Sequence, residues 1–321
     1  MSGGLGGSSP RLAPSGGRTV DLAKATAPVP SPVPGVVRKR RRWPLPFSPW
    51  HLVLVPATII LIFPFFWMIV TSVETSSEAL RFPPDLTPHV LRFTNYPDAL
   101  RAAPFGRFFW NSAVVAVTTV VSNLVFCAGA GYAFARFRFL GRGLLFVLIM
   151  TTLMVPFQVT MIPQFIITKW IGVHLLAGAG IGHIGSLIVP NAATAFGVFF
   201  LRQFFRTLPI EYEEAARVDG ASRLTVLLRI VLPLSAPAMA TLAALTFLDS
   251  WNNFLWPLIA INSTGAMTLP LGLATFQGAH STQWTLLMAG NMMSLIPMLL
   301  VFLLAQRYFV RSVAATGLTG T

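Results

Sequence analysis

Six apolar stretches constrain what this chain can fold into. Each is long enough to cross about 30 Å of hydrocarbon at about 1.5 Å per residue of helix. They cover residues 52–73, 110–134, 143–167, 184–205, 235–262 and 285–309. Because lipid offers no hydrogen-bond partners to the backbone, spans of this kind are helices. The sequence therefore predicts an all-α integral membrane protein with six transmembrane helices, of which those holding Pro156, Pro163, Pro237 and Pro257 are kinked.

Composition agrees with a membrane protein and argues against a soluble domain. Hydrophobic residues make up 54% of the 321 residues and charged residues only 10%, whereas about a quarter of residues are charged in soluble domains. The formal charge of +13 does not indicate a nucleic-acid partner, because the basic residues lie in short clusters between the apolar stretches. The single Cys127 can form no disulfide within the chain and is expected to pack as a small hydrophobe.

The distribution of lysine and arginine predicts the orientation of the chain. If the apolar stretches alternate in direction, 18 of the 23 basic residues fall on one side, among them the run from Arg38 to Arg42. Cytoplasmic loops retain positive charge. Both termini are therefore expected in the cytoplasm, together with the loop between the fourth and fifth apolar stretches.

That loop carries a charged, helix-forming segment. We expect Thr207 to cap a helix with Pro209 in its first turn, Gly220 to end it, and Ser222 to cap a second helix over residues 223–231. Small side chains ringed by charges suit a partner's groove, although an ordinary loop helix is the alternative. The residues of the predicted docking surface are Glu211, Glu213, Glu214, Ala215, Ala216, Arg217, Asp219 and Gly220.

The same segment carries a spaced motif. It reads Glu214-Ala215-Ala216, three residues, Gly220, nine residues, Ile230, one residue, Leu232-Pro233. At every fixed position this resembles the EAA signature of binding-protein-dependent ABC importer permeases. Further segments are similar to the maltose-type carbohydrate permeases, and they are Asn95-Tyr96, Tyr132 to Arg136, Ile162-Pro163, Trp251 to Pro257 and Gln306 to Arg311.

The resemblance implies the partners of the chain. A permease of this family forms one half of a heterodimeric pore in the cell membrane of a prokaryote, beside a second, different permease subunit and in contact with membrane lipid. An extracytoplasmic binding protein delivers the solute. Two cytoplasmic ABC ATPase subunits receive the coupling helix, which is the segment from Glu211 to Gly220, in their clefts.

The resemblance also implies that the chain is a transport subunit and not an enzyme. ATP and Mg²⁺ would be bound by the ATPase subunits, with no cofactor in this chain. Its three lysines, Lys24, Lys39 and Lys169, do not lie in a G-x-x-x-x-G-K-[ST] phosphate-binding loop. The histidines His174, His183 and His280 are too scattered to predict a metal site.

Polar residues inside the apolar stretches are candidates for the solute path. Asp249 is the only acid expected within a span, and Asn252, Asn253 and Trp256 follow at helical spacing on its stripe. These groups can hydrogen-bond sugar hydroxyls and stack on a sugar ring; hydrogen bonding between helices is the alternative. Asn191 and Asn291 are weaker candidates for the same path.

The resemblance divides the chain and leaves its cargo open. The predicted segments are a disordered, Pro/Gly/Ser-rich cytoplasmic tail with its basic cluster at 1–50, the first transmembrane helix with an extracytoplasmic loop at 51–107, an ABC transmembrane type-1 core at 108–309 with the EAA loop at about 207–233, and a cytoplasmic tail at 310–321. A sugar is the expected cargo, with a polyol or glycerol phosphate as the alternative. An ion-coupled secondary transporter is a remote alternative, because it would need several acids within its spans.

Overall fold

The computed structural model describes residues 3, 50–174, 180–278 and 282–317, with side chains described up to Arg307. The predictions for residues 4–49 and for His280 therefore lie outside the described residues. The chain divides into two units, residues 1–57 and 58–321, and the packing described below concerns the second. Its described residues are helices and loops, with one isolated bridge between Gln277 and Thr282.

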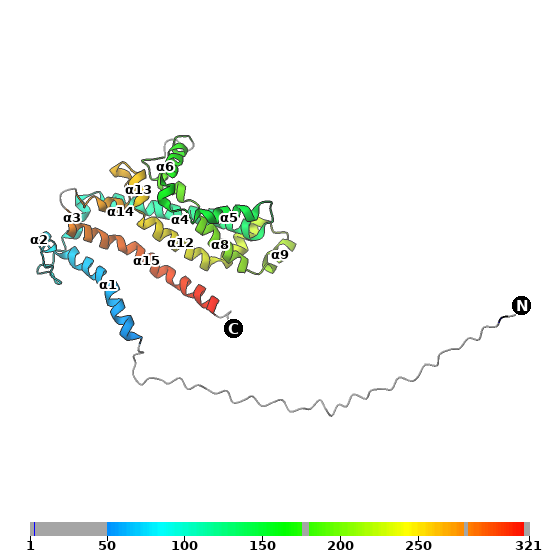
Figure 1. The fold of residues 1–321 in the computed structure, drawn as a ribbon, viewed down its shortest axis with the longest axis horizontal. Helices are drawn as coiled ribbons and strands as arrows, with labels where there is room; N and C mark the ends of the chain where they lie inside the picture. Colours follow the sequence, from blue (N-terminus) through cyan, green and yellow to red (C-terminus); the bar gives the residue numbers. More distant parts are fainter. Residues whose placement is uncertain (1–2, 4–49, 175–179, 279–281, 318–321) are drawn as a thin grey trace, which may run out of the picture. The chain divides into compact units, whose positions relative to one another are not determined.

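The helices follow one another in the order of Figure 1. They are α1 His51–Val73, α2 Ser76–Ala79, α3 Asn95–Ala102, α4 Phe105–Arg136, α5 Arg142–Thr152, α6 Phe157–His174, α7 Gly185–Ile188 with the 3-10 turn η2 Val189–Asn191, α8 Ala195–Thr207, α9 Glu211–Val218, α10 Arg223–Val226 with the π-helical turn η3 Leu227–Val231, α11 Leu232–Leu234, α12 Ala236–Asn252, α13 Leu255–Ala260, the 3-10 turn η4 Thr264–Ala266, α14 Leu269–Ala274 and α15 Trp284–Gly317.

Three of the predicted spans are continuous helices. His51–Val73, Phe105–Arg136 and Trp284–Arg307 are each long and apolar enough to cross a membrane. They confirm the predictions at 52–73 and 110–134 and the start of the last span at 285–309. The helix of that last span continues beyond residue 309 to Gly317.

The other three predicted spans are interrupted. The kink expected at Pro156 is a break between α5 and α6, the span at 184–205 has a bend that the sequence did not predict, and the span at 235–262 begins at a sharp bend just before Pro237 and is divided into α12 and α13. The bend is 107° between α5 and α6, 42° between Gly185–Asn191 and α8, and 80° between Arg223–Leu234 and α12. The first break falls at Pro156, which cannot donate a backbone hydrogen bond and disfavours helix in the residue before it. Three to six candidate spans result, depending on whether each bent pair crosses as one.

Helix α4 is the centre of the fold. It packs against α8 and α12, the three lying side by side in Figure 1, and α12 packs in turn against α15. Near α9 and α10, Leu201, Phe205 and Leu242 form one apolar core. Phe105, Phe108 and Trp251 form another near the first turn of α4.

The first half of α4 is fastened to the loop before α14. The Asn111 amide donates to the carbonyl oxygens of Gly265 and Met267 at 3.0 and 2.9 Å. The Ser112 hydroxyl oxygen accepts a hydrogen bond from the Leu269 backbone N–H at 2.7 Å. These bonds saturate backbone groups of a half-buried segment, which would otherwise lose hydrogen bonds to water without replacement.

Candidate functional site

Helix α9 begins later than the sequence suggested. Thr207 is the last residue of α8, and its hydroxyl donates to the Phe204 carbonyl oxygen at 2.7 Å. Ile210, which has no side-chain cap, precedes the first residue Glu211. The prediction that Thr207 caps this helix is therefore wrong, because α8 continues through it. Glu211, Glu213 and Glu214 still lie in the first turn, where the helix dipole favours carboxylates.

The end of α9 and the start of α10 agree with the sequence. Gly220 has φ +85°, and the N–H groups of Gly220 and Ala221 bond the carbonyl oxygens of Arg217 and Ala216 at 3.1 and 2.9 Å. This is the Schellman pattern, which ends a helix with a left-handed residue. The Ser222 hydroxyl then accepts from the Thr225 N–H at 3.2 Å and caps α10. The predicted stop and cap are confirmed.

Gly220→Ala is expected to lower the free energy of unfolding by about 1 kcal/mol or more, because a Cβ disfavours the left-handed backbone. No atom would obstruct that Cβ, so the effect isolates the backbone strain. Thermal unfolding of the detergent-solubilised permease measures it. The matched control is Gly129→Ala, on α4, where the space is also open and φ is not positive, and which should stabilise the helix slightly. Equal effects of the two substitutions would contradict the prediction.

Helix α9 presents two different faces. Glu211, Glu214, Ala215, Arg217 and Asp219 are exposed, as is Gly220 after the helix end. Ala216 is half-buried against the core shared with α4 and α8. Sequence reasoning missed two exposed apolar side chains here, Tyr212 and Val218, of which Val218 is 88% exposed. Apolar residues within a charged helix were the signal that could have identified them.

Glu213 does not belong to the exposed face. It is 7% exposed, and its Oε1 accepts from Arg136 Nε at 2.6 Å while its Oε2 accepts from the Tyr132 hydroxyl at 2.8 Å. Its predicted place on the docking surface is therefore wrong. The reason is its position on the helix, which turns the side chain toward the end of α4. Glu211 and Glu214 are exposed, and Glu214 lines the small hollow beside Arg136 and Glu213.

Four predicted path residues meet at one cavity of about 860 Å³. They come from the end of α12 and from α13, and Asn191 joins them from η2. The residues that line the cavity are Phe157, Gln164, Asn191, Leu248, Asp249, Asn252, Asn253, Phe254, Leu255 and Trp256. Asp249 and Asn252 are exposed to it. Carboxylate and amide groups on an otherwise apolar wall suit a hydroxyl-bearing solute.

The arrangement of these residues differs from the predicted helical stripe. Helix α12 ends at Asn252, and Asn253 is extended, with ψ 116°. The Asn253 side-chain oxygen accepts from the Trp256 backbone N–H at 3.2 Å in the first turn of α13. An interruption of the helix between Asn252 and Leu255, and not helical spacing, therefore brings the two sides of the cavity together.

Trp256 lines the cavity but offers little surface for contact with a solute. It is 2% exposed, its indole N–H donates to the Ser186 carbonyl oxygen at 3.0 Å, and its ring meets the edge of Phe157. The prediction that this indole offers a free hydrogen-bond donor and a free ring face to a sugar is therefore wrong, since the donor is bonded to α7 and the ring packs against α6.

A second cavity, of about 370 Å³, shares Asn191 and Asp249 with the first. Its further lining residues are Thr119, Thr194, Phe196, Leu242, Leu245 and Thr246. The Thr119 hydroxyl is buried and has no hydrogen-bond partner among the described residues. Sequence reasoning missed Thr119, Thr246 and Gln164, although each is a polar residue within an apolar stretch. Asn291, predicted for the path, is half-buried on α15 and lies outside both lining sets.

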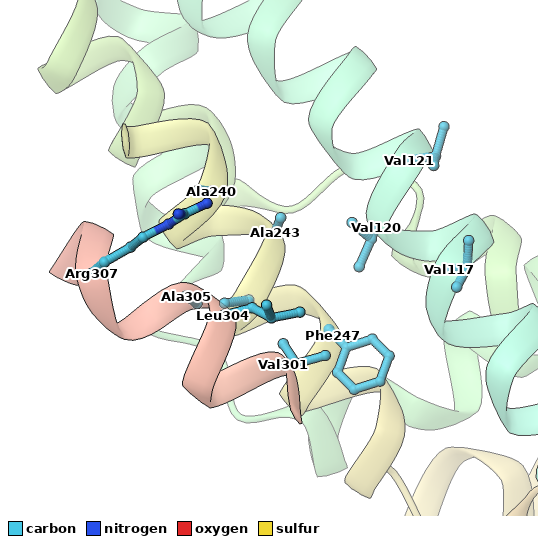
Figure 2. A pocket seen from close by; sticks show the side chains of 11 residues that line it. Val117, Val120, Val121, Ala240, Ala243, Phe247, Val301, Leu304, Ala305 and Arg307 are labelled. Carbon is cyan, nitrogen blue, oxygen red and sulfur yellow. The ribbon is translucent and has the colours of Figure 1, made fainter. Parts of the chain in front are cut away.

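A third hollow, of about 420 Å³, has a different character. Figure 2 shows valines of α4 facing the aliphatic side chains of α15 across it, with the Arg307 side chain reaching toward Ala240 of α12. Arg307 is its one charged lining residue, and the others are Val, Ala, Leu and Phe. Such a surface suits lipid tails or another helix and not a sugar. Within the part of the chain that is described, no group of three His, Cys, Asp or Glu side chains is placed to hold a metal ion.

Comparison with known proteins identifies the family. Residues 126–315, more than half of the chain, match the family of binding-protein-dependent transport system inner membrane components. The chain belongs to this family. It is a permease of an ABC importer and a transport subunit, and ATP is bound by the ATPase subunits of such an importer. Family membership decides against the ion-coupled secondary transporter.

Individual relatives cover most of the permease. The arabinooligosaccharides transport system permease protein AraQ of Bacillus subtilis (strain 168) is 34% identical over 82% of this chain and 92% of its own length. The lactose transport system permease protein LacG of Rhizobium radiobacter is 33% identical over 85% and 96%. The sn-glycerol-3-phosphate transport system permease protein UgpE of Brucella abortus (strain 2308) is 33% identical over 83% and 95%.

A solved structure has the same fold. In the crystal structure of a bacterial ABC transporter that imports the acidic polysaccharide alginate, one chain superimposes with a TM-score of 0.70 at 24% identity. The match covers 82% of the permease and 99% of that chain.

Proposed function

We propose that the permease carries an uncharged saccharide, delivered by an extracytoplasmic binding protein, through the cavity lined by Asp249, Asn252 and Asn253. The observation that carries this proposal is the chemistry of the lining. It combines three amides of asparagine, one of glutamine and one carboxylate with aromatic side chains, and it includes no lysine or arginine. Relatives named for arabino-oligosaccharides and lactose point to the same class of solute.

A sugar phosphate or glycerol phosphate is the second candidate. Its support is the 33% identity to the glycerol-3-phosphate permease. A phosphate group is recognised by arginine, lysine or helix N-termini, whereas the one charged residue lining this cavity is Asp249. The lining therefore favours the neutral solute.

The cargo proposal predicts which solute stimulates the importer. The test uses the complete importer with its binding protein in proteoliposomes, and ATP hydrolysis is measured with an arabino-oligosaccharide, lactose or glycerol 3-phosphate at equal concentration. We expect stimulation by a neutral saccharide, with the importer lacking binding protein as the control. Stimulation by glycerol 3-phosphate alone would overturn the assignment.

We propose further that the exposed face of α9, with Glu211, Glu214, Ala215, Arg217 and Asp219, docks into the cleft of an ATPase subunit. The small side chain of Ala215 allows close approach, and the surrounding charges with the exposed Val218 supply polar and apolar contacts. Ala216 and Gly220 support this face from behind and from its end. Two ATPase subunits and a second, different permease subunit would complete the importer.

The proposed topology has six spans and both termini in the cytoplasm of a prokaryotic cell. It treats each bent pair as one crossing. Its support is the excess of basic residues, 18 of 23, on the side of α9. The contact between Arg136 at the end of α4 and Glu213 on α9 agrees with this topology, since it requires both groups on one side.

A further inference from the structure

The buried carboxylate of Glu213 joins α9 to the last turns of α4. Each of its oxygens has its own partner, Arg136 at 2.6 Å and Tyr132 at 2.8 Å. Arg136 also donates to the Leu208 carbonyl oxygen at 2.8 Å, in the short link between α8 and α9. Charge-assisted hydrogen bonds of this length are strong, and burial protects them from screening by salt. We call these three side chains, Tyr132, Arg136 and Glu213, the latch.

Neighbouring contacts fix the end of α4 from two more sides. The Arg223 guanidinium, on α10, lies 4.6 Å from the centre of the Phe137 ring. Arg202, on α8, donates to the Phe134 carbonyl oxygen at 3.3 Å. The end of α4 is therefore bound to α8, α9 and α10 together, and the latch supplies its buried ionic contact.

Helix α4 connects the latch to the solute path without interruption. It runs from Phe105 to Arg136 as one helix, and Thr119, in the wall of the second cavity, lies about 20 Å along the axis from Tyr132. The covalent route from α9 to α12 is different, since it passes through the π-helical turn η3 and a bend of 80°. A bend absorbs displacement, whereas a continuous helix transmits it.

We infer that the latch is the mechanical joint of the permease: it passes the displacement of α9 to α4 and so moves the α4 wall of the cavity. The three latch residues are positioning residues, and none of them needs to touch the solute or the ATPase. The inference rests on the proposed docking of α9. It assigns Glu213 and Glu214, adjacent in the sequence, to separate tasks, the first inside the permease and the second toward the ATPase.

The test follows α4 directly and needs no knowledge of the cargo. Thr119→Cys is introduced into the complete, reconstituted importer, and the rate of its modification by a small thiol reagent is measured with and without a non-hydrolysable ATP analogue. Thr119 is 3% exposed, so the introduced thiol should react slowly until the α4 wall moves, and the natural Cys127, which is 0% exposed, serves as the background. With the latch intact, the nucleotide should change the modification rate. With Glu213→Gln, we expect that change to shrink roughly tenfold while the ATPases stay bound and still hydrolyse ATP.

Matched variants separate a joint from a general structural role. Asp85→Asn removes a surface carboxylate from the loop between α2 and α3, outside both α4 and the docking face of α9, and should leave the nucleotide response of the introduced thiol intact. Tyr132→Phe removes a single hydroxyl, and should weaken the response even if Glu213→Gln fails to assemble. The exchanged pair Arg136→Glu with Glu213→Arg should restore part of the nucleotide response that Glu213→Gln loses.

Two outcomes would overturn the inference. In the first, Glu213→Gln and Tyr132→Phe keep the full nucleotide response. In the second, both lose ATPase binding together with the response, which would make the latch a part of the docking surface or of the fold. Failure of the docking proposal looks different, because then Glu214→Lys would leave ATPase binding unchanged whatever the latch variants do.

Discussion

Glu214→Lys is expected to abolish association of the permease with its ATPase subunits while the permease still inserts into the membrane. Glu214 is exposed near the start of α9, beside Ala215, at the edge of the small hollow that the latch residues also line. Reversing its charge places a repulsive group at the docking surface, which should weaken association at least about 100-fold. Co-purification of the ATPases and solute-stimulated ATP hydrolysis in the reconstituted importer measure the effect.

The control for Glu214→Lys is Asp85→Lys, the same change of charge in the loop between α2 and α3. Asp85 lies on the surface, where it pairs with Arg81 at 3.0 Å, and exposed pairs contribute little to stability. ATPase association should be normal in this control. Normal stimulated turnover in Glu214→Lys itself would contradict the coupling assignment.

Asp249→Asn is expected to reduce solute uptake by roughly tenfold or more, because it removes the charged acceptor of the solute path. Asp249 lines both polar cavities, whereas its neighbours Asn252 and Asn253 line only the larger one. The substitution preserves shape, so membrane insertion and ATPase association should be unchanged. Uptake of labelled saccharide into proteoliposomes, compared with ATPase co-purification, is the measurement.

Trp256→Ala provides the contrast with Asp249→Asn. Trp256 is buried and bonded to Ser186, and loss of a buried tryptophan side chain costs about 3–5 kcal/mol of stability. This variant should lose assembled protein as well as uptake, while Asp249→Asn loses uptake alone. Unchanged uptake kinetics in Asp249→Asn would mean that the carboxylate only packs helices.

Local signals in the sequence predicted the parts of the fold that depend on local chemistry. The apolar length of three stretches was enough to place three continuous spans, and Gly220 and Ser222 marked the turn between α9 and α10 because their roles involve only neighbouring backbone groups. Pro257 was interpreted as a kink within one helix, although a new helix was the better interpretation. It lies in the first turn of α13, where proline is favoured, and so indicated a new helix after Asn253.

The rest depended on residues far apart in the chain. Glu213 turns inward because Arg136 and Tyr132, 77 and 81 residues away, lie opposite it. No periodicity within α9 separates Glu213 from the exposed Glu211 and Glu214. The meeting of Asn191 with Asp249 at two cavities has the same origin, since it follows from the packing of η2 and α8 beside α12.

The Asn111 amide donates to the loop before α14, and the Ser112 hydroxyl accepts from the first residue of α14. These bonds attach the first half of α4 to its neighbours, as the latch attaches its last turns. A helix attached at both ends can transmit a displacement from either end to the other. By thermodynamic reciprocity, if nucleotide on the ATPases shifts the loop around Gly265 to Leu269 by way of α4, then a protein bound to that loop shifts nucleotide affinity by the same factor. Binding of a loaded binding protein at that loop would then change the nucleotide affinity of the ATPases, on the other side of the membrane, before any solute has moved.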